Sequence, residues 1–372
     1  MKIAFAGGRG IPAHYGGFET AVEEIGARLV ARGHDVTVYS RAGYGDASGD
    51  EHRGMRRVET GYLRKRSLET LSHTFTAILH AARNRPDVLI LVNPANGPLL
   101  LLTRLLRIPT AINVDGLDWE RSKWPPLGRR VILFGAWCCA KFAPAIIADS
   151  KGIGDYYRER WGRDSFYASY GAEPWTFAPP KLLAEYGLES RRYLLVVARL
   201  EPENNIELIV NAYLESGLDD PLVIVGDTNY KSDYVERLRS MAPADRVRFL
   251  GSVYDRDRLR DLLGHCGLYL HGHSVGGTNP ILLEAMACGA CIAYLDVSFH
   301  AEVCGEAGIP FPATLSECAG VMRDASRDPE RAESLRGAAR TRQAERYTWD
   351  AATDRYEALC QSLKEKGRAP RE

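Results

Sequence analysis

Residues 1–32 read MKIAFAGGRG IPAHYGGFET AVEEIGARLV AR. The apolar run Lys2–Gly7 has the length and composition of a short buried strand, and a long glycine-rich loop follows it. The segment Phe18–Arg32 then places apolar residues on one face at helical spacing. A strand, a loop and a helix in this order predict the first βα unit of a parallel sheet.

The same alternation continues along the whole chain. Strand-like runs in the first half are Lys2–Gly7, Asp35–Arg41, Arg57–Leu63, Asp87–Asn93, Thr110–Asp115, Ala145–Ser150 and Phe166–Gly171. A second series consists of Tyr193–Arg199, Leu222–Gly226, Val247–Gly251, Leu268–His271 and Cys291–Leu295. Helical segments lie between the runs, so the sequence predicts doubly wound α/β sheets with helices on both faces.

An irregular stretch rich in proline and tryptophan separates the two series at residues 172–188. We therefore expect two Rossmann-like domains, over residues 1–171 and 172–350, and 372 residues are enough for two separate cores. A long helical tail starts at Pro329. Open α/β sheets bind ligands at the carboxyl ends of their strands, so we expect the site in an interdomain cleft that the two sheets face.

The composition excludes several classes of protein. Lys+Arg and Asp+Glu are 48 each, so the chain has no bulk positive field for binding nucleic acid. The eight cysteines are scattered along the chain, which indicates a reducing compartment. We find neither a signal-peptide pattern nor a stretch long and apolar enough to span a membrane. We therefore expect a cytoplasmic protein.

The first loop partly matches a dinucleotide-binding fingerprint over residues 8–13. The fingerprint requires a tight turn directly into the helix, whereas this helix is expected to start only near Gly17. An NADP-dependent oxidoreductase with Arg41 on the 2′-phosphate is an alternative, but it explains only the first forty residues. The pair Gly16 and Gly17 instead suits close approach of a ligand to a helix N-terminus.

The stretch Asn113–Trp124 follows a predicted strand and holds three acids, two bases and two tryptophans. A tryptophan ring can cover the apolar side of a sugar while carboxylates accept from its hydroxyls. We expect Asp115, Asp118 and Trp119 to contact a sugar, with Asp115 at the strand terminus pointing into the cleft. The alternative is a solvated polar loop.

Two loops of the second half are typical of phosphate binding. Arg199 ends a predicted strand, where a guanidinium suits a phosphate group. Residues 273–289 read HSVGGTNPILLEAMACG, with small and hydrogen-bonding residues directly before a helix whose free N–H groups would face a diphosphate. Glu284, one turn into that helix, suits an acceptor for ribose hydroxyls. Its alternative is an ordinary surface acid.

Three further patterns are assigned to structure. Cys288 and Cys291 have metal-like spacing but no second pair, so we expect buried reduced thiols. The segment Asp255–Asp257 resembles a metal-binding motif but precedes a helix as an N-cap would. The Gly-x-Ser-x-Gly motif of serine hydrolases is absent. The sequence thus predicts no metal site and no catalytic triad.

Taken together, these residues resemble a known family. Gly16–Glu19, Ala148–Ser150, Arg199 and Glu284–Gly289 resemble motifs of the retaining glycosyltransferases of the GT-B fold, family 4. The strings GGRGIPAxYGGFET and HSVGGTNP are similar to the subgroup that contains bacterial rhamnosyltransferases of capsule and cell-wall polysaccharide synthesis. The resemblance covers essentially the whole chain.

The resemblance implies a nucleotide-diphosphate sugar donor in the C-terminal domain and an acceptor in the N-terminal domain. It also implies a C-terminal helix, residues 351–372, that crosses back to the N-terminal domain. The implied reaction is retaining, metal-independent and free of cofactors, with L-rhamnose moving from dTDP-rhamnose to a lipid-linked or glycan acceptor. A UDP- or GDP-sugar donor is one alternative, and a non-catalytic sugar-binding protein on the same scaffold is another.

The resemblance also assigns roles to residues. The expected donor-binding residues are Gly16, Gly17, Arg199, Asn205, Gly276, Gly277, Thr278, Asn279 and Glu284. The expected acceptor-binding residues are Asp115, Asp118 and Trp119, and the expected catalytic residues are Asp115, Arg199 and Glu284.

Three positions depart from the wider family. Gly276 stands where the first of two glutamates is usual, Asn205 replaces a phosphate-binding lysine, and Asp115 replaces a strand-end histidine. Arg199 must then contribute more to phosphate binding, or another base must help.

Basic residues gather in two parts of the predicted N-terminal domain. They are Arg53, Arg56, Arg57, Arg64, Lys65 and Arg66, and further along Arg121, Lys123, Arg129 and Arg130. Trp119, Trp124 and the apolar helix expected from Val131 lie beside the second group. Bases attract anionic lipid and tryptophans favour the headgroup level, so we expect reversible peripheral association with the inner membrane face. The alternative is a solvated basic face on a neutral protein.

Overall fold

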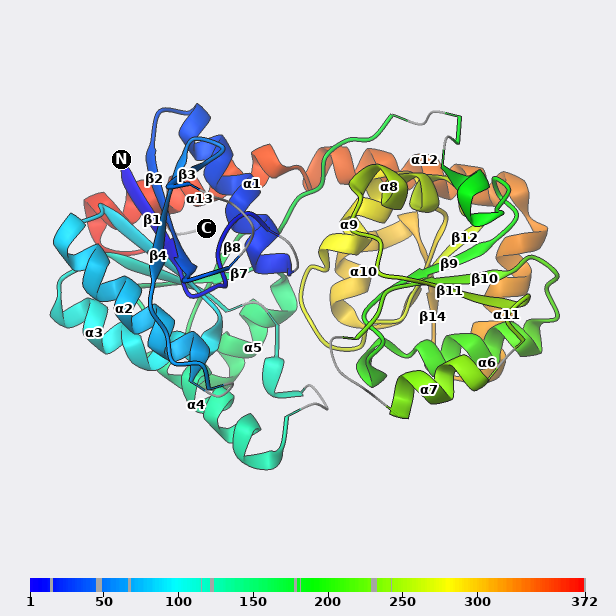
Figure 1. Cartoon of the computed structure of the whole chain (residues 1–372), viewed down its shortest axis with the longest axis horizontal. Coiled ribbons are helices and arrows are strands. Elements are labelled where there is room, and N and C mark those ends of the chain that lie inside the picture. Colours follow the sequence, from blue (N-terminus) through cyan, green and yellow to red (C-terminus); the bar gives the residue numbers. More distant parts are fainter. Residues whose placement is uncertain are drawn as a thin grey trace. The chain divides into compact units, whose positions relative to one another are not determined.

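The structure of this 372-residue chain is a computed structural model. It describes residues 1–13, 16–44, 49–65, 68–114, 116–120, 124–176, 179–180, 182–228, 233–241 and 243–370. The chain divides into two compact units, residues 1–171 with 349–372 and residues 172–348, and each is described by itself (Figure 1).

The first unit is an α/β sandwich around one sheet. Its strands are β1 (Lys2–Ala6), β2 (Asp35–Arg41), β3 (Glu51–His52), β4 (Met55–Thr60), β5 (Val88–Val92), β6 (Thr110–Asn113), β7 (Ala145–Ala148) and β8 (Phe166–Tyr167). Its helices are α1 (Gly17–Ala31), α2 (Glu69–Asn84), α3 (Leu100–Leu105), α4 (Pro126–Phe142), α5 (Lys151–Trp161) and α13 (Trp349–Lys366), with 3₁₀ turns η1 (Pro94–Leu99) and η2 (Asp118–Glu120).

The described strands of this unit form an eight-stranded sheet in the order β3-β4-β2-β1-β5-β6-β7-β8. All neighbours are parallel except β3 and β4. Every residue of β5 is buried, as a parallel strand covered by helices on both faces requires. The C-terminal helix α13 packs against α1, where Arg32 contacts Asp354 at 2.7 Å and Glu357 at 2.8 Å.

The second unit has its own sheet and core. Its strands are β9 (Leu194–Val197), β10 (Leu222–Val225), β11 (Val247–Gly251), β12 (Leu268–His271), β13 (Ile292–Leu295) and β14 (Ile309–Phe311). Its helices are α6 (Ile206–Ser216), α7 (Asp233–Ser240), α8 (Arg256–His265), α9 (Pro280–Ala287), α10 (Ser298–Cys304), α11 (Leu315–Arg327) and α12 (Pro329–Arg346), with 3₁₀ turns η3 (Leu183–Tyr186), η4 (Pro202–Asn204) and η5 (Gly305–Ala307).

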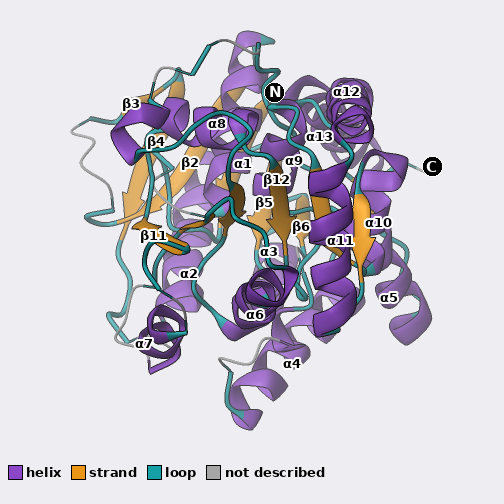
Figure 2. Cartoon of the chain, turned by 90° about the vertical axis from the view of Figure 1, so that its right-hand side faces the viewer, coloured by secondary structure: helices purple, strands orange, loops and turns teal. Residues whose placement is uncertain are grey.

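The described strands of the second unit pair in the order β11-β10-β9-β12-β13-β14, all parallel. The chain leaves β9 toward β10 on one side and later returns to β12 on the other. The strand order therefore reverses between β9 and β12, and the connections that follow these two strands lead to opposite sides of the reversal. Helices cover both faces of the strands (Figures 1 and 2).

The predicted fold class is confirmed, because both halves are parallel α/β sheets. The strand predicted over Asp35–Arg41 and the one over Leu268–His271 have the observed bounds. The strands β3 and β14 were not predicted, since each has only two or three residues and no sustained apolar alternation. The run Phe166–Gly171 contains only the two-residue strand β8.

The segments predicted to be structural behave as expected. Asp255 caps α8, accepting through Oδ1 from the N–H groups of Asp257 at 2.9 Å and Arg258 at 3.1 Å. Cys288 and Cys291 are buried free thiols, and burial raises the pKa of each. In the part of the chain that the structure describes, no helix combines the length and apolarity needed to cross a membrane.

Helix α4 approaches the η1 turn through two glycines. A Cβ on Gly135 would lie 2.5 Å from the carbonyl oxygen of Pro94, and one on Gly97 would lie 2.0 Å from the carbonyl oxygen of Gly135. The backbones can touch only because both side chains are hydrogen. This contact presses one side of α4 onto the domain and turns its opposite side outward.

We predict that Gly135→Ala destabilises the protein by about 1–3 kcal/mol, because the added methyl group overpacks a backbone contact that cannot yield. Gly128→Ala in the same helix is the matched control, since its Cβ would meet its nearest neighbour at 3.4 Å, close to ordinary contact. Alanine is the better helix former, so the control is expected to be neutral or slightly stabilising. Urea denaturation of both variants measures the difference, and equal unfolding midpoints would contradict the account.

Candidate functional site

Two predicted loops of the second unit meet at the point where its strand order reverses. Ser274, in the loop after β12, donates through both its N–H and its hydroxyl to the carbonyl oxygen of Glu203, each at 2.9 Å. Asn205 donates through Nδ2 to the carbonyl oxygen of Gly272 at 2.8 Å. The loops after β9 and β12 therefore form one unit at the carboxyl edge of the sheet, where open α/β sheets bind their ligands.

The position of Asn205 explains part of this arrangement. Its backbone is left-handed, with φ at 52°, so the chain turns sharply between η4 and α6. Its side chain is engaged with the neighbouring loop, and Asn204 holds the carbonyl oxygen of Arg199 at 2.7 Å. The side chain of Asn205 thus links the two loops by a hydrogen bond. The Arg199 side chain is half-buried at the end of β9.

The loop over residues 276–279 leads into α9. Gly276 has φ at 152°, and a Cβ built there would meet nothing within 4 Å, so the backbone is open on that side. Thr278 is buried, and Asn279 caps the helix by accepting from the N–H of Ile281 at 3.2 Å. Pro280 occupies the first helical position, where its missing N–H costs nothing.

Glu284 is not an exposed surface acid. Its side chain is 14% exposed, and Oε1 accepts from Nε of Arg260 on α8 at 2.6 Å. Burial opposes the charge of this guanidinium, but the carboxylate of Glu284 outweighs it, so the pKa of Arg260 is raised above its ordinary value. The predicted residues Arg199, Asn205, Gly276–Asn279 and Glu284 therefore belong to loops and a helix at one edge of one sheet.

A stack of histidines lies behind this edge. The ring of His271, the last residue of β12, is 4.3 Å from that of His273 and 4.5 Å from that of His300 on α10. His300 donates from Nδ1 to the carbonyl oxygen of Leu295 at 3.0 Å, which assigns its proton to Nδ1 in the neutral ring. Burial lowers the pKa of His271, helped by the neighbouring His273 and His300, and lowers the pKa of His300 to about 4. Among the described residues, no cluster of three or more His, Cys, Asp or Glu side chains could hold a metal ion.

The first unit places the glycine-rich loop at the carboxyl end of β1. The N–H of Arg9 donates to Oε1 of Glu19 at 2.9 Å, and the N–H of Ala13 donates to Oε2 of Glu23 at 2.6 Å. Two carboxylates of α1 thus already satisfy N–H groups that a dinucleotide pyrophosphate would need. Gly16 caps α1 with φ at 128°, and a Cβ there would collide with the carboxylate of Glu19.

Arg41 is also occupied. Its guanidinium contacts Glu69 at 3.2 Å and donates to Oγ1 of Thr70 at 2.9 Å, and burial lowers its pKa. These partners leave it poorly placed for a 2′-phosphate. The geometry therefore disfavours the oxidoreductase alternative.

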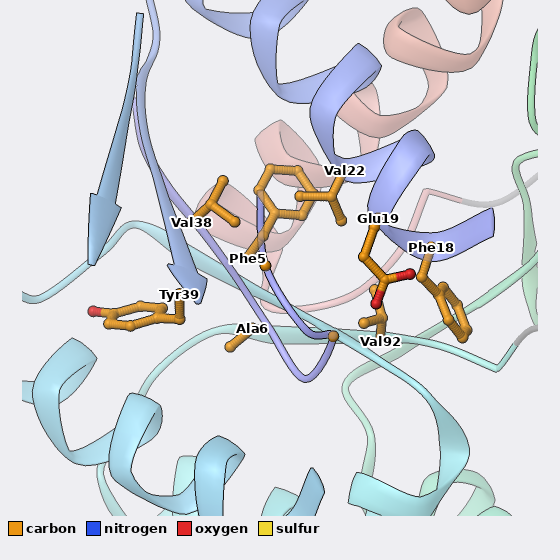
Figure 3. Close-up of a pocket in the computed structure, with 10 residues that line it drawn as sticks. Phe5, Ala6, Phe18, Glu19, Val22, Val38, Tyr39 and Val92 are labelled. Atoms are coloured by element: carbon orange, nitrogen blue, oxygen red, sulfur yellow. The ribbon is translucent and has the colours of Figure 1, made fainter. Parts of the chain in front are cut away.

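A small apolar hollow lies beside the glycine loop (Figure 3). Figure 3 shows Phe5, Val22 and Val38 on one side of it and Phe18, Glu19 and Val92 on the other. Glu19 contributes the carboxylate in a lining that is otherwise dominated by apolar groups. Glu19 occurs in the recognised motif, but sequence reasoning gave it no role of its own, because its contact with the loop backbone is not visible in the sequence.

The predicted sugar-contacting stretch is only partly described. Asp115 lies outside the described residues, as does the side chain of Asp118. Trp119 is 9% exposed, and its ring packs 5.3 Å from that of Tyr156. Most of this ring therefore belongs to the core of the first unit.

Two family models match this chain. The model described as "Glycosyl transferase 4-like domain" matches residues 16–165, and the one described as "Glycosyl transferases group 1" matches residues 181–342. The first match lies within the first unit and the second within the second. Together they cover most of the chain, including every described strand of the second sheet.

Known proteins are similar to this chain in sequence and in fold. The O-antigen chain mannosyltransferase B of Escherichia coli is 27% identical over 180 residues, which is 46% of this chain and 46% of that enzyme, so the match spans less than half of the relative. The solved structure of Anabaena HepE in complex with UDP has a TM-score of 0.78 at 19% identity, covering 98% of this chain and 100% of that one. Sucrose-phosphate synthase from Thermosynechococcus elongatus has a TM-score of 0.83 at 20% identity, covering 97% and 98%. These likenesses show the fold.

We predict that the buried neutral histidines make the protein sensitive to acid. Burial lowers the pKa of His73 and of His300 to about 4, from 6.5 in the unfolded chain. Below about pH 6.5 the unfolded chain binds protons that the folded chain refuses, so stability is full above that pH and falls as the pH drops toward 4. Urea unfolding between pH 7 and 4.5 measures the slope.

The variant His300→Asn keeps a side-chain N–H near the position of Nδ1 but cannot take up the proton. It is expected to reduce the slope by up to about 1.4 kcal/mol per pH unit. An unchanged slope in this variant would show that His300 titrates normally in the folded protein.

Proposed function

Because this chain belongs to the GT-B glycosyltransferases of the family 4, group 1 type, we propose that it transfers a sugar from a nucleotide-diphosphate donor to a lipid-linked or glycan acceptor in cell-surface polysaccharide synthesis. The observation that carries the proposal is the joined pair of loops at the strand-order reversal of the second sheet. That HepE was solved with UDP supports a nucleotide donor.

The proposed donor site lies at the carboxyl edge of the second unit's sheet. The proposed donor-binding residues are Gly16, Gly17, Arg199, Asn205, Gly276, Gly277, Thr278, Asn279 and Glu284. The diphosphate lies at the N-terminus of α9, where free N–H groups and the helix dipole favour negative charge. Glu284 accepts from the 3′-hydroxyl of the donor's deoxyribose through the oxygen that Arg260 does not hold.

The reaction proceeds with retention and without a metal or cofactor. The acceptor hydroxyl oxygen attacks the anomeric carbon on the face from which the diphosphate oxygen leaves, and its proton passes to that oxygen. Arg199 and the N-terminus of α9 stabilise the charge that develops on the leaving diphosphate. Asn205 stands where a lysine is usual. Its side-chain amide donates to the carbonyl oxygen of Gly272 and so maintains the loop that presents the phosphate site.

The acceptor occupies the first unit. Asp115 acts on the acceptor or anomeric side, and Asp118 and Trp119 contact the acceptor. The donor is dTDP-rhamnose, which is supported by the strings GGRGIPAxYGGFET and HSVGGTNP and by the glycine at position 276. A glycine there removes the acid that normally contacts the donor sugar. A UDP- or GDP-sugar is the alternative donor.

The protein acts at the cytoplasmic face of the inner membrane, where a lipid-linked acceptor would be met. The described basic residues do not all support this. Arg53 pairs with Glu24 at 3.0 Å, and the buried Arg57 pairs with Glu59 at 2.5 Å. Arg66, Arg121 and Lys123 lie outside the described residues. Arg129 and Arg130 of the same predicted group are exposed on α4.

We predict that dTDP-rhamnose raises the melting temperature of the protein. A ligand at 100 times its dissociation constant adds about 2.7 kcal/mol of stability. Glu284→Gln is expected to weaken dTDP binding by about 1–3 kcal/mol, through the loss of a charge-assisted hydrogen bond. A thermal-shift series with dTDP-, UDP- and GDP-sugars, followed by calorimetry with dTDP, measures both.

Glu207→Gln is the matched control, because this glutamate forms an exposed pair with Arg237 on the surface of the same unit. It should bind dTDP as the wild type does. Stabilisation by UDP- or GDP-sugars alone would overturn the rhamnose assignment. No stabilisation by any nucleotide sugar would overturn the proposed function.

A further inference from the structure

The large apolar side chains that are exposed are unevenly distributed. Among the described residues, eleven of the thirteen belong to the first unit, and two belong to the second. Soluble monomers rarely expose contiguous apolar surface without a partner for it. The asymmetry therefore directs attention to the helices of the first unit.

Two adjacent helices, α3 and α4, carry six of these side chains, including the two most exposed (Figure 1). The set is called the α3–α4 face and consists of Leu101, Leu105, Leu127, Val131, Phe134 and Trp137. The four members on α4 follow one another at intervals of four, three and three residues, so they form one stripe along the helix. Leu105 is 79% exposed and Leu127 is 72% exposed. The opposite side of α4 is buried through the glycine contact with η1, so this helix is apolar on both sides.

The charged side chains on and directly after α3 and α4 are all basic, and Glu120, on the η2 turn that packs against α4, is an exposed acid nearby. The exposed bases beside it are Arg104, Arg107, Arg129, Arg130 and Lys141. The sequence has no acid from residue 88 to 114 or from 124 to 148. None of these five bases forms an ion pair with another described residue. An apolar face surrounded by unpaired bases complements a surface that is apolar below and anionic at the level of the headgroups.

We propose that the α3–α4 face docks the protein on an anionic lipid bilayer. Phe134 and Trp137, whose rings are 5.8 Å apart, enter the boundary between headgroups and acyl chains, and the bases contact lipid phosphates. The inference rests on the proposed function only in that docking would bring the acceptor side of the enzyme to a lipid-linked acceptor.

The test is co-sedimentation with vesicles of phosphatidylcholine alone and of phosphatidylcholine with phosphatidylglycerol. The wild type is expected to pellet with the anionic vesicles at low salt and to be released at high salt. The double variant Phe134→Ser with Trp137→Ser should lose about tenfold or more of its partition coefficient, because two aromatic side chains no longer enter the bilayer. Tyr254→Ser, which removes an exposed aromatic ring of the second unit, is the control and should bind as the wild type does.

Equal binding to both vesicle types, or undiminished binding of the double variant, would overturn the proposal. A wild type that is dimeric in solution, with a double variant that is monomeric, would also overturn the proposal, since a second copy would then cover the face. Calorimetry with dTDP separates this proposal from the proposed function. A double variant that binds dTDP normally but does not bind vesicles supports the docking face. A wild type that binds vesicles but no nucleotide contradicts only the proposed function.

A separate observation concerns Arg260. Its Nε holds Glu284 at 2.6 Å between α8 and α9, and both side chains are about 15% exposed. Its Nη2 is buried and has no hydrogen-bond partner in the described part of the chain. A buried N–H group without an acceptor lowers the stability of the fold. An ion pair that served only stability would therefore not be expected to leave Nη2 of Arg260 without a partner. The arrangement instead keeps one carboxylate oxygen of Glu284 occupied and the other available.

We infer that Arg260 is a positioning residue of the donor site. It holds Glu284 in one orientation, so that the remaining oxygen meets the sugar hydroxyl of the nucleotide. It also supplies a positive charge in the unit where Asn205 has replaced the usual lysine. This inference depends on the proposed role of Glu284.

Calorimetry with dTDP and UDP tests it in four variants: Arg260→Met, Arg260→Lys, Glu284→Gln and the double variant Arg260→Met with Glu284→Gln. We expect Arg260→Met to weaken binding about tenfold or more, because Glu284 loses its charge-assisted partner. Arg260→Lys should restore part of the loss. The double variant should be no weaker than the weaker single variant, since the two residues act as one unit.

Arg258→Met is the matched control on the same helix, because Arg258 pairs with Glu185 at the surface. It should leave binding unchanged. Melting temperatures identify a variant that fails to fold. If Arg260→Met does not fold, the dTDP affinity of Arg260→Lys tests the positioning role in its place. Wild-type affinity in Arg260→Met and Arg260→Lys would overturn the positioning role alone. Absence of nucleotide binding by the wild type would overturn the proposed function, and the positioning role with it.

Discussion

The candidate site depends on the hydrogen bonds that join the loops after β9 and β12. Ser274 and Asn205 satisfy backbone carbonyl groups across the point where the strand order reverses. Parallel strands end at the same edge, but only at such a reversal do neighbouring loops part and leave room above the sheet. The connections after β9 and β12 lead to opposite sides of this point, and these hydrogen bonds hold the two loops in a single arrangement there.

The first unit uses carboxylates for a comparable purpose. Glu19 and Glu23 project from the first two turns of α1 and accept from the backbone of the glycine-rich loop. The loop is thereby folded back onto its own helix. This explains why a pattern that resembles a dinucleotide fingerprint has a different geometry: the N–H groups are already satisfied, and the helix begins at Gly17.

Much of the fold was predictable because burial on both faces of a parallel sheet demands continuous apolar runs. Such runs identified β2 and β12 to the residue, and the glycine loops identified the edge that carries the site. Elements without this signal were missed, such as the short strand β14. The ion pair between Arg260 and Glu284 was also missed, since residues 24 apart on two helices share no local pattern.

On the surface of the first unit, too, the sequence did not show which side chains are buried and which are exposed. The sequence directed attention to clustered bases and to Trp119, but Arg57 is buried and Trp119 packs against Tyr156. The apolar helix expected from Val131 is α4, and six of the exposed apolar side chains of the described residues belong to it and to α3.

The sequence by itself determined the fold class, the order of strands and helices, and the loops that could meet a phosphate. These properties follow from local periodicity and from residues with special backbone conformations. The tertiary structure alone decided which charges are paired, which aromatic rings are exposed and which loops touch. Pairing and exposure depend on distances between segments far apart in the chain. Local sequence carries no measure of those distances.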